Sequence, residues 1–357
     1  MNSLFTPIRL RDLEIRNRVW MPPMCQYHAT DGLPEDWHFV HYGARAAGGY
    51  GLIIAEATGI VPEGRISPAC TGLWNDEQEA AWSRIVSFVH SQGAKMGIQL
   101  NHAGRKASTI PWLPGRGDGS VREGGWETVG PSAVAQEGID PPREMTLEEI
   151  QALPGQFAAA ASRAVRADFD TVELHGAHGY LLHQFLTPLA NHRTDEWGGS
   201  FENRTRLFRA VARAVRGVLL EGMPLLVRLS ATDWIDGAWD LEQSVALASL
   251  LIDDGVDLID VSTGGAANAR IPVGPGFQVE FASEIRRRSG MPTAAVGMIT
   301  EPEQALAIVE SGDADAVLIG RAGLRDPSWA LRAAHETGLD RSEIPYPDSY
   351  WRASRRR

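Results

Sequence analysis

The hydrophobic pattern of the chain alternates short apolar runs with longer stretches in which apolar residues recur every three or four positions. Runs with the length of buried strands, each bounded by Gly, Pro or polar residues, cover 18–22, 51–55, 95–100, 171–174, 225–229, 258–261, 293–296 and 316–319. Helical patterns lie between them at 76–92, 146–167, 202–219, 241–254, 280–289, 302–311 and 327–337. Thr146 precedes Glu149 at capping-box spacing, which predicts a helix start there. The alternation predicts an α/β fold, a (β/α)8 TIM barrel with parallel strands.

An open doubly wound sheet is the alternative fold. A dinucleotide-binding sheet needs a Gly-x-Gly-x-x-Gly turn after its first strand, and none follows the first run here. We therefore expect one barrel domain over residues 1–357.

Three further segments decorate this predicted barrel. Residues 1–16 contain an alternating pattern around a turn at Arg11-Asp12, which predicts a β-hairpin lid on one end. Insertions at 101–145 and 186–200 follow the third and fourth strands, so we expect both to overhang the C-terminal face, where barrel enzymes carry their sites. Residues 340–357 form a C-terminal tail.

Composition narrows the class of protein. The net charge of −11 and the pI near 5.4 argue against a nucleic-acid surface. No apolar run approaches the roughly 18 residues of a membrane span, and the N-terminus lacks the pattern of a signal peptide. Two cysteines, Cys25 and Cys70, are too few for a disulfide framework. These features predict a cytoplasmic enzyme that binds neither nucleic acid nor membrane.

A histidine pair follows the fourth predicted strand. His175, His178 and Tyr180 lie on a Gly-flanked turn, which can aim two imidazoles and a phenol at one small volume. Such a cluster can bind an oxyanion and deliver a proton. The alternative is that one histidine satisfies backbone groups of the core while the other binds a metal or has no function.

Polar and glycine residues also stand at the ends of the other strands. Arg228 lies inside an apolar run and needs a negatively charged partner at the barrel mouth, and Gln99 needs hydrogen-bond partners for the same reason. Gly297 and Gly320-Arg321 follow the last two strands, where barrels hold phosphate through backbone N–H groups. A phosphate there, with Arg, Gln and paired His across the mouth, points to FMN.

Ordered motifs along nearly the whole chain then carry a family resemblance. They are Leu-Phe-Thr-Pro near the start, Asn17-Arg18-Val19 leading into Pro23-Met24-Cys25-Gln26-Tyr27, Gln99-Leu-Asn-His-Ala-Gly-Arg105-Lys106, His175-Gly-Ala-His178-Gly-Tyr180, Arg193-Thr-Asp-Glu-Trp-Gly-Gly-Ser-Phe-Glu-Asn-Arg204, and Gly320-Arg321. The chain resembles the old yellow enzyme family of FMN-dependent ene-reductases, in particular the group with YqjM and xenobiotic reductase A.

The resemblance implies tightly bound FMN, transient NADPH and a set of site residues. The FMN-binding positions would be Pro22, Pro23, Met24, Cys25, Ala57, Gln99, Arg228, Gly265, Gly297, Gly320 and Arg321, with no metal; relatives can carry Ser at the position of Pro22. Tyr27, His175 and His178 would bind the substrate, and Tyr180 would be the catalytic acid. Relatives also place a C-terminal residue in a neighbour's site, so the resemblance implies a homodimer or dimer of dimers. Candidates for that residue are Tyr350, Trp351 and Arg352, with Trp351 expected to contact the substrate; the alternative is a tail packed on its own barrel.

The expected reaction is reduction of the C=C bond of α,β-unsaturated carbonyl compounds and related activated alkenes. Arg228 can balance the negative charge of a reduced flavin because it never loses its proton. Cys25 is expected to tune the flavin through its polarisable sulfur, or else to be an inert buried thiol.

Three other functions are alternatives to this reaction. A dienoyl-CoA reductase needs an iron–sulfur cluster and a second nucleotide-binding region, for which two cysteines and 357 residues leave no room. A metal-dependent hydrolase would use His175 and His178 with Asp233 or Asp260. A non-catalytic flavin-binding sensor would have no use for the acid Tyr180.

Overall fold

A closed parallel barrel forms the centre of the computed structural model, which describes residues 2–354. Its strands, in their order around the barrel, are β10 (Leu258–Ser262), β11 (Thr293–Ala295), β12 (Ala316–Leu318), β3 (Val19–Met21), β4 (Leu52–Gly59), β5 (Lys95–Asn101), β8 (Thr171–Gly176) and β9 (Leu225–Ser230). Each of the eight apolar runs is one of these strands, so the predicted (β/α)8 barrel is confirmed.

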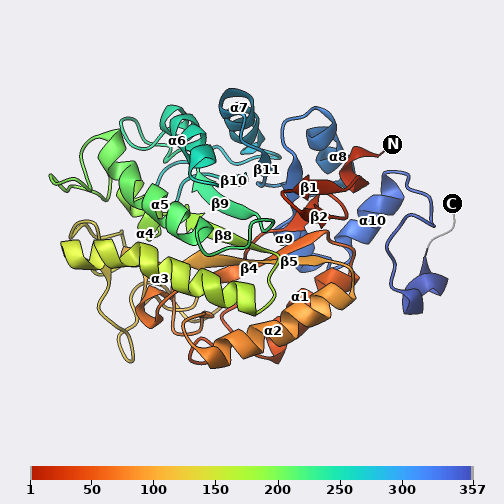
Figure 1. The fold of residues 1–357 in the computed structure, drawn as a ribbon, viewed down its shortest axis with the longest axis horizontal. Helices are drawn as coiled ribbons and strands as arrows, with labels where there is room; N and C mark the ends of the chain where they lie inside the picture. The colour runs from red at the N-terminus through yellow and green to blue at the C-terminus, as the bar shows by residue number, and fades with distance from the viewer. Residues whose placement is uncertain (1, 355–357) are drawn as a thin grey trace.

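Helices surround the barrel (Figure 1). They are α1 (Asp36–Ala47), α2 (Asp76–Ser91), α3 (Leu147–Arg166), α4 (Leu181–Leu186), α5 (Phe201–Arg216), α6 (Leu241–Asp253), α7 (Val279–Ser289), α8 (Pro302–Glu310), α9 (Arg321–Arg325) and α10 (Trp329–Glu336). The capping box is formed as predicted: Glu149 N–H donates to Thr146 Oγ1 at 3.2 Å, and Thr146 N–H donates to Glu149 Oε2 at 2.8 Å. The pattern did not predict α1, α4 or α9; the last two have too few turns to show a helical period.

The predicted N-terminal hairpin closes the amino end of the barrel. Strands β1 (Ile8–Leu10) and β2 (Leu13–Ile15) pair antiparallel, and their apolar side chains pack with Leu52 and Leu258 at the starts of β4 and β10. Arg11 Nε lies 2.7 Å from Asp257 Oδ1, just before β10. The hairpin is therefore a lid on the end opposite the strands' carboxyl termini.

The first insertion lies over the opposite end of the barrel. It contains a short helix, η3 (Gly104–Lys106), and a parallel strand pair, β6 (Val129–Gly130) and β7 (Arg143–Glu144). Lys106 Nζ donates to His178 O at 2.8 Å and to Gly265 O at 3.2 Å, which joins the insertion to the loops after β8 and β10. This is the carboxyl face that the sequence predicted it would cover.

The C-terminal tail lies beside α10 at the edge of the molecule, where both termini are found (Figure 1). It ends in η4 (Asp348–Ala353), whose Tyr350 and Trp351 side chains are exposed. No helix among residues 2–354 is both long and apolar enough to cross a membrane.

Candidate active site at the carboxyl end of the barrel

Four polar side chains from four neighbouring strands form a ring inside the barrel mouth. They are Gln99 of β5, Glu173 of β8, Arg228 of β9 and Asp260 of β10. Strand register pairs Gln99 with Glu173, His175 with Arg228, and Arg228 with Asp260. Gln99 Nε2 donates to Glu173 Oε1 at 2.8 Å, and Arg228 Nε lies 3.1 Å from Asp260 Oδ2. The negatively charged partner that the sequence required for Arg228 is therefore Asp260, and all four side chains are buried.

The charges of this ring are set by burial. Burial, opposed by Arg228, raises the pKa of Asp260 to about 6. Burial first, and the nearby Asp260 second, also raise the pKa of Glu173 well above its usual range. At pH 7 the ionised Asp260 therefore pairs with Arg228, and its charge opposes ionisation of the nearby Glu173, so the two carboxyl groups do not both carry a full negative charge against one guanidinium.

The two predicted histidines meet above this ring. The rings of His175 and His178 are 5.3 Å apart and nearly perpendicular, and the Tyr180 ring is 4.8 Å from His175. Burial first, and Arg228 second, lower the pKa of both imidazoles well below the usual value, so both are neutral at pH 7. His175 Nδ1 accepts the Ala177 N–H at 3.3 Å, so its proton is on Nε2, which is available as a donor.

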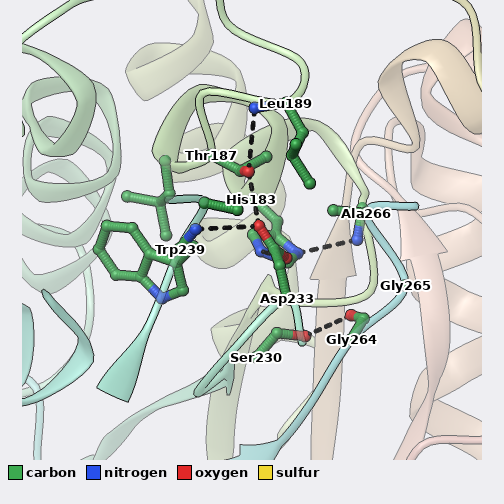
Figure 2. Close-up of polar contacts among 12 residues, drawn as sticks. His183, Thr187, Leu189, Ser230, Asp233, Trp239, Gly264, Gly265 and Ala266 are labelled. Carbon is green, nitrogen blue, oxygen red and sulfur yellow. Dashed lines mark hydrogen bonds and ion pairs between the residues drawn. The ribbon is translucent and has the colours of Figure 1, made fainter. Parts of the chain in front are cut away.

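A buried network holds the turn that carries these side chains (Figure 2). Gly179 N–H donates to His183 Nδ1 at 2.9 Å, and His183 Nε2 lies 3.1 Å from Asp233 Oδ1. Thr187 Oγ1 and the Trp239 N–H both donate to Asp233 Oδ2, at 2.6 and 3.2 Å. This network fixes the backbone between His178 and Tyr180, and nothing in the sequence pattern indicated it.

Two glycines let the loops after β8 and β10 touch at this turn. A Cβ on Gly179 would lie 2.3 Å from Gly265 O, and a Cβ on Gly265 would lie 2.5 Å from the His178 Cα. His178 Nε2 lies 2.8 Å from the Ser262 hydroxyl, which belongs to the same β10 end. Gly265, predicted to contact FMN, thus supports the backbone of His178.

Two partly buried phenols stand beside the histidines. Burial is the largest cause that raises the pKa of both Tyr27 and Tyr180, so both keep their protons at neutral pH. Lys106 Nζ lies 5.1 Å from the centre of the Tyr180 ring, and burial lowers the pKa of this lysine to about 8. A cation near the ring would stabilise the phenolate left after Tyr180 gives up its proton.

A cavity of about 320 Å³ extends from the ring of polar side chains to the ends of β11 and β12. Its lining contains the predicted residues Pro22, Pro23, Met24, Arg228, Gly297, Gly320 and Arg321, together with Met298, Thr300 and Arg325, which were not predicted. Within residues 2–354, neither Arg321 nor Arg325 forms an ion pair with a carboxylate. Two unpaired cations beside glycine backbone make this end of the cavity suitable for a phosphate.

Cys25, predicted to contact FMN, lies next to a second cysteine. The residue is partly exposed, and the hydrogen bond to Cys70 is the largest cause that raises the pKa of its thiol, followed by burial. Ala57 packs in the same small apolar cluster as Cys70, and Tyr27 and Tyr180 pack against that cluster. The structure therefore brings Cys25 close to the two phenols.

The alternative metal site does not assemble. Asp260 pairs with Arg228, and Asp233 pairs with His183, so neither carboxylate joins His175 and His178. Among residues 2–354, the group of His, Cys, Asp and Glu side chains that could hold a metal contains neither His175 nor His178.

The predicted substrate residue Trp351 lies outside the cluster of His175, His178 and Tyr180. The guanidinium of Arg341 covers its ring at 4.2 Å.

The polar atoms at the barrel mouth fit FMN. Within residues 2–354, Gln99 Oε1 and Arg228 Nη2 have no hydrogen-bond partner, and the buried amide of Asn101, at the end of β5, has none for either end. Donors and acceptors without partners next to a phosphate-binding cavity are what a flavin mononucleotide requires. Fold and site thus define a barrel oxidoreductase that uses FMN.

Comparisons with known proteins agree with this class. The NADH:flavin oxidoreductase / NADH oxidase family matches residues 3–340. The NADPH dehydrogenase of Listeria monocytogenes serovar 1/2a is 46% identical over 356 residues, 99% of each chain, and that of Bacillus subtilis strain 168 is 44% identical over 353 residues, 98% of each chain. The structure of morphinone reductase superposes with a TM-score of 0.80 and 30% identity, covering 98% of this chain and 96% of that one.

The chain belongs to the NADH:flavin oxidoreductase / NADH oxidase family. The resemblance to the old yellow enzymes is confirmed, and so is the expectation of an FMN-dependent oxidoreductase.

Proposed function

We propose that this protein is an NADPH dehydrogenase that reduces the C=C bond of α,β-unsaturated carbonyl compounds and related activated alkenes. The observation that carries the proposal is the cluster of two neutral imidazoles and a protonated phenol beside the FMN-binding cavity. Residues such as Pro23, Met24 and Arg228 would hold FMN, which would supply hydride transfer between NADPH and the alkene. Relatives named NADPH dehydrogenase support NADPH as the reductant.

The side chains of the cluster take different parts in this reaction. His175 Nε2 and the His178 ring, with the Tyr27 hydroxyl, would hydrogen-bond the carbonyl oxygen of the substrate and stabilise the negative charge that develops there. Neutral imidazoles suit this task because they donate a hydrogen bond without giving up a proton. Tyr180, on the other side of His175, would protonate the α-carbon, and nearby Lys106 would stabilise the resulting phenolate.

A visible spectrum of the purified protein tests the proposal directly. We expect a yellow protein that bleaches when NADPH is added without oxygen and regains its colour when cyclohexenone follows. A protein that bleaches but does not regain its colour would refute alkene reduction. A non-catalytic flavin-binding sensor would not oxidise NADPH without a partner protein. Oxidation of NADPH by the purified protein alone would therefore exclude this alternative.

Replacing both His175 and His178 with Ala should weaken the binding of phenolic ligands, whose anions imitate the developing enolate. Loss of two hydrogen bonds to a charged oxygen corresponds to about 3 kcal/mol or more, roughly a hundredfold in Kd. Titration of the flavin absorbance with p-hydroxybenzaldehyde measures this affinity. Unchanged affinity would remove the histidines from the oxyanion site.

We further propose a homodimer or dimer of dimers in which Trp351 reaches a neighbour's substrate site. In one chain Trp351 is 46% exposed, with one face of its ring covered by Arg341, and neighbouring Tyr350 is 59% exposed, so apolar surface of both rings remains open to a neighbouring chain. A cytoplasmic location is part of this proposal, supported by the two cysteines, which are both unpaired.

Truncation before Ser349 should reduce both the particle size and the substrate affinity if the tail completes a neighbouring site. Light scattering measures the size, and KM for cyclohexenone measures the affinity. A Trp351→Ala variant separates the two effects because it keeps the backbone of the tail. If truncation leaves both quantities unchanged, the shared site is excluded.

A further inference from the structure

Three side chains from separate segments converge beside the phenols of the active site. Cys25 follows β3, Glu56 lies within β4, and Cys70 lies in the loop after β4. One ligand atom from each, the two sulfurs and a carboxylate oxygen, lie within 4.8 Å of one another. Glu56 and Cys70 are fully buried, while Cys25 is partly exposed, so the group can be reached from the active-site side.

We propose that Cys25, Glu56 and Cys70 form a binding site for a thiophilic divalent cation, Zn²⁺ or its probe Cd²⁺. Two thiolates and one carboxylate are ligands that Zn²⁺ takes in proteins. In a tetrahedral site with Zn–S bonds of about 2.3 Å, ligand atoms are roughly 3.8 Å apart, so the present spacing requires only small side-chain shifts. Binding forms two metal–sulfur bonds and one metal–oxygen bond, and the two thiol protons leave to solvent.

The carboxylate of this site is already oriented by neighbouring groups. Gln26 N–H donates to Glu56 Oε2 at 3.1 Å, and His38 Nε2 lies 3.1 Å from Glu56 Oε1. His38 Nδ1 accepts the Glu35 N–H at 2.9 Å, so a ring proton is on Nε2, which donates it to Glu56 Oε1. Hydrogen bonds of this kind around a ligand are typical of metal sites in proteins.

The same two cysteines could instead form a disulfide by losing two protons and two electrons to an oxidant such as a peroxide. The structure favours the cation because Glu56 shares the cluster. A carboxylate has no part in a disulfide, whereas a divalent cation offsets the negative charge of three acidic groups crowded together.

A cation at this site would inhibit the enzyme. Three protein ligands leave the fourth tetrahedral position open, and Cys25 and Tyr27 both pack against the apolar cluster that contains Cys70 and borders Tyr180. Cation binding would draw Cys25 away from FMN and restrict the space between the phenols. Inhibition rests on the proposed function, but cation binding does not.

Titration with Cd²⁺ of FMN-loaded protein in which the cysteine thiols are reduced tests the site. We expect an ultraviolet cadmium–thiolate absorption band that saturates at one Cd²⁺ per chain. Zn²⁺ should displace the Cd²⁺ and abolish the band. Cys70→Ser, which removes one sulfur and keeps the size of the side chain, should weaken binding by more than about tenfold, the loss expected even for outer partners of a metal ligand. Ser162→Ala is the control, since it removes a hydroxyl that donates to Ala158 O within α3 and contacts none of the three ligands.

Turnover provides a second readout. Zn²⁺ should slow NADPH-dependent alkene reduction by the wild type, a chelator should reverse the effect, and Cys70→Ser should resist it. Absence of the ultraviolet band, or equal Cd²⁺ affinity in Cys70→Ser and the wild type, would overturn the site. Loss of both free thiols on peroxide treatment, in protein that binds no Cd²⁺, would assign the pair to a disulfide. Because the band needs no turnover, it remains informative if alkene reduction fails.

Discussion

Replacing Arg228 with Met is expected to abolish stable FMN binding. The guanidinium is buried at the barrel mouth, pairs with Asp260 and lines the cavity, and it is the cationic member of the ring that also contains Gln99 and Glu173. Losing the hydrogen bonds that a buried charged donor makes to the flavin costs about 3 kcal/mol, or roughly 100-fold in affinity. Breaking the buried pair with Asp260 separately costs about 3–5 kcal/mol of folding stability. The ratio of flavin to protein absorbance after desalting, and FMN fluorescence quenching on titration, measure the loss.

Two variants separate this effect from a loss of folding. The double variant Arg228→Met/Asp260→Asn removes the carboxylate that would be left unpaired, so it should regain thermal stability without regaining FMN. Arg287→Met removes an arginine from an exposed ion pair with Glu284 and should change neither property. An Arg228→Met protein that keeps FMN at wild-type affinity would contradict the assignment of Arg228 to the flavin.

Replacing Tyr180 with Phe should slow the reduction of the alkene by about 10²- to 10⁴-fold, the range for a general acid. Flavin reduction by NADPH should stay nearly unchanged, because it needs no proton from this residue. Phe retains the ring contact with His175 at 4.8 Å and the one with Lys106 at 5.1 Å, so the site should keep its shape. Anaerobic stopped-flow measurement of the two half-reactions separates them.

Tyr27→Phe is the matched control, because it removes the hydroxyl of the other partly buried phenol that packs against the same apolar cluster. It should weaken substrate binding, seen as a higher KM, while proton delivery by Tyr180 continues. Equal slowing of both half-reactions in Tyr180→Phe would show that the residue shapes the site and does not act as the acid.

The sequence predicted the strands of the barrel to within a few residues. The run 258–261, for example, is strand Leu258–Ser262, and the Thr146–Glu149 cap starts its helix as expected. Polar residues at strand ends also indicated the site, because parallel strands in a barrel bring their carboxyl ends to one face. The pattern showed that Arg228 needs a negative partner, but it did not show which carboxylate that is.

The sequence by itself therefore determined the barrel and the local turn of His175, His178 and Tyr180, and it predicted the face at which FMN binds. Only the tertiary structure decided that Asp260 pairs with Arg228, and that Cys70 lies beside Cys25. The physical reason is the range of the interactions: periodicity and capping act between near neighbours in the chain, whereas these pairs depend on strand register and loop packing between segments far apart in sequence.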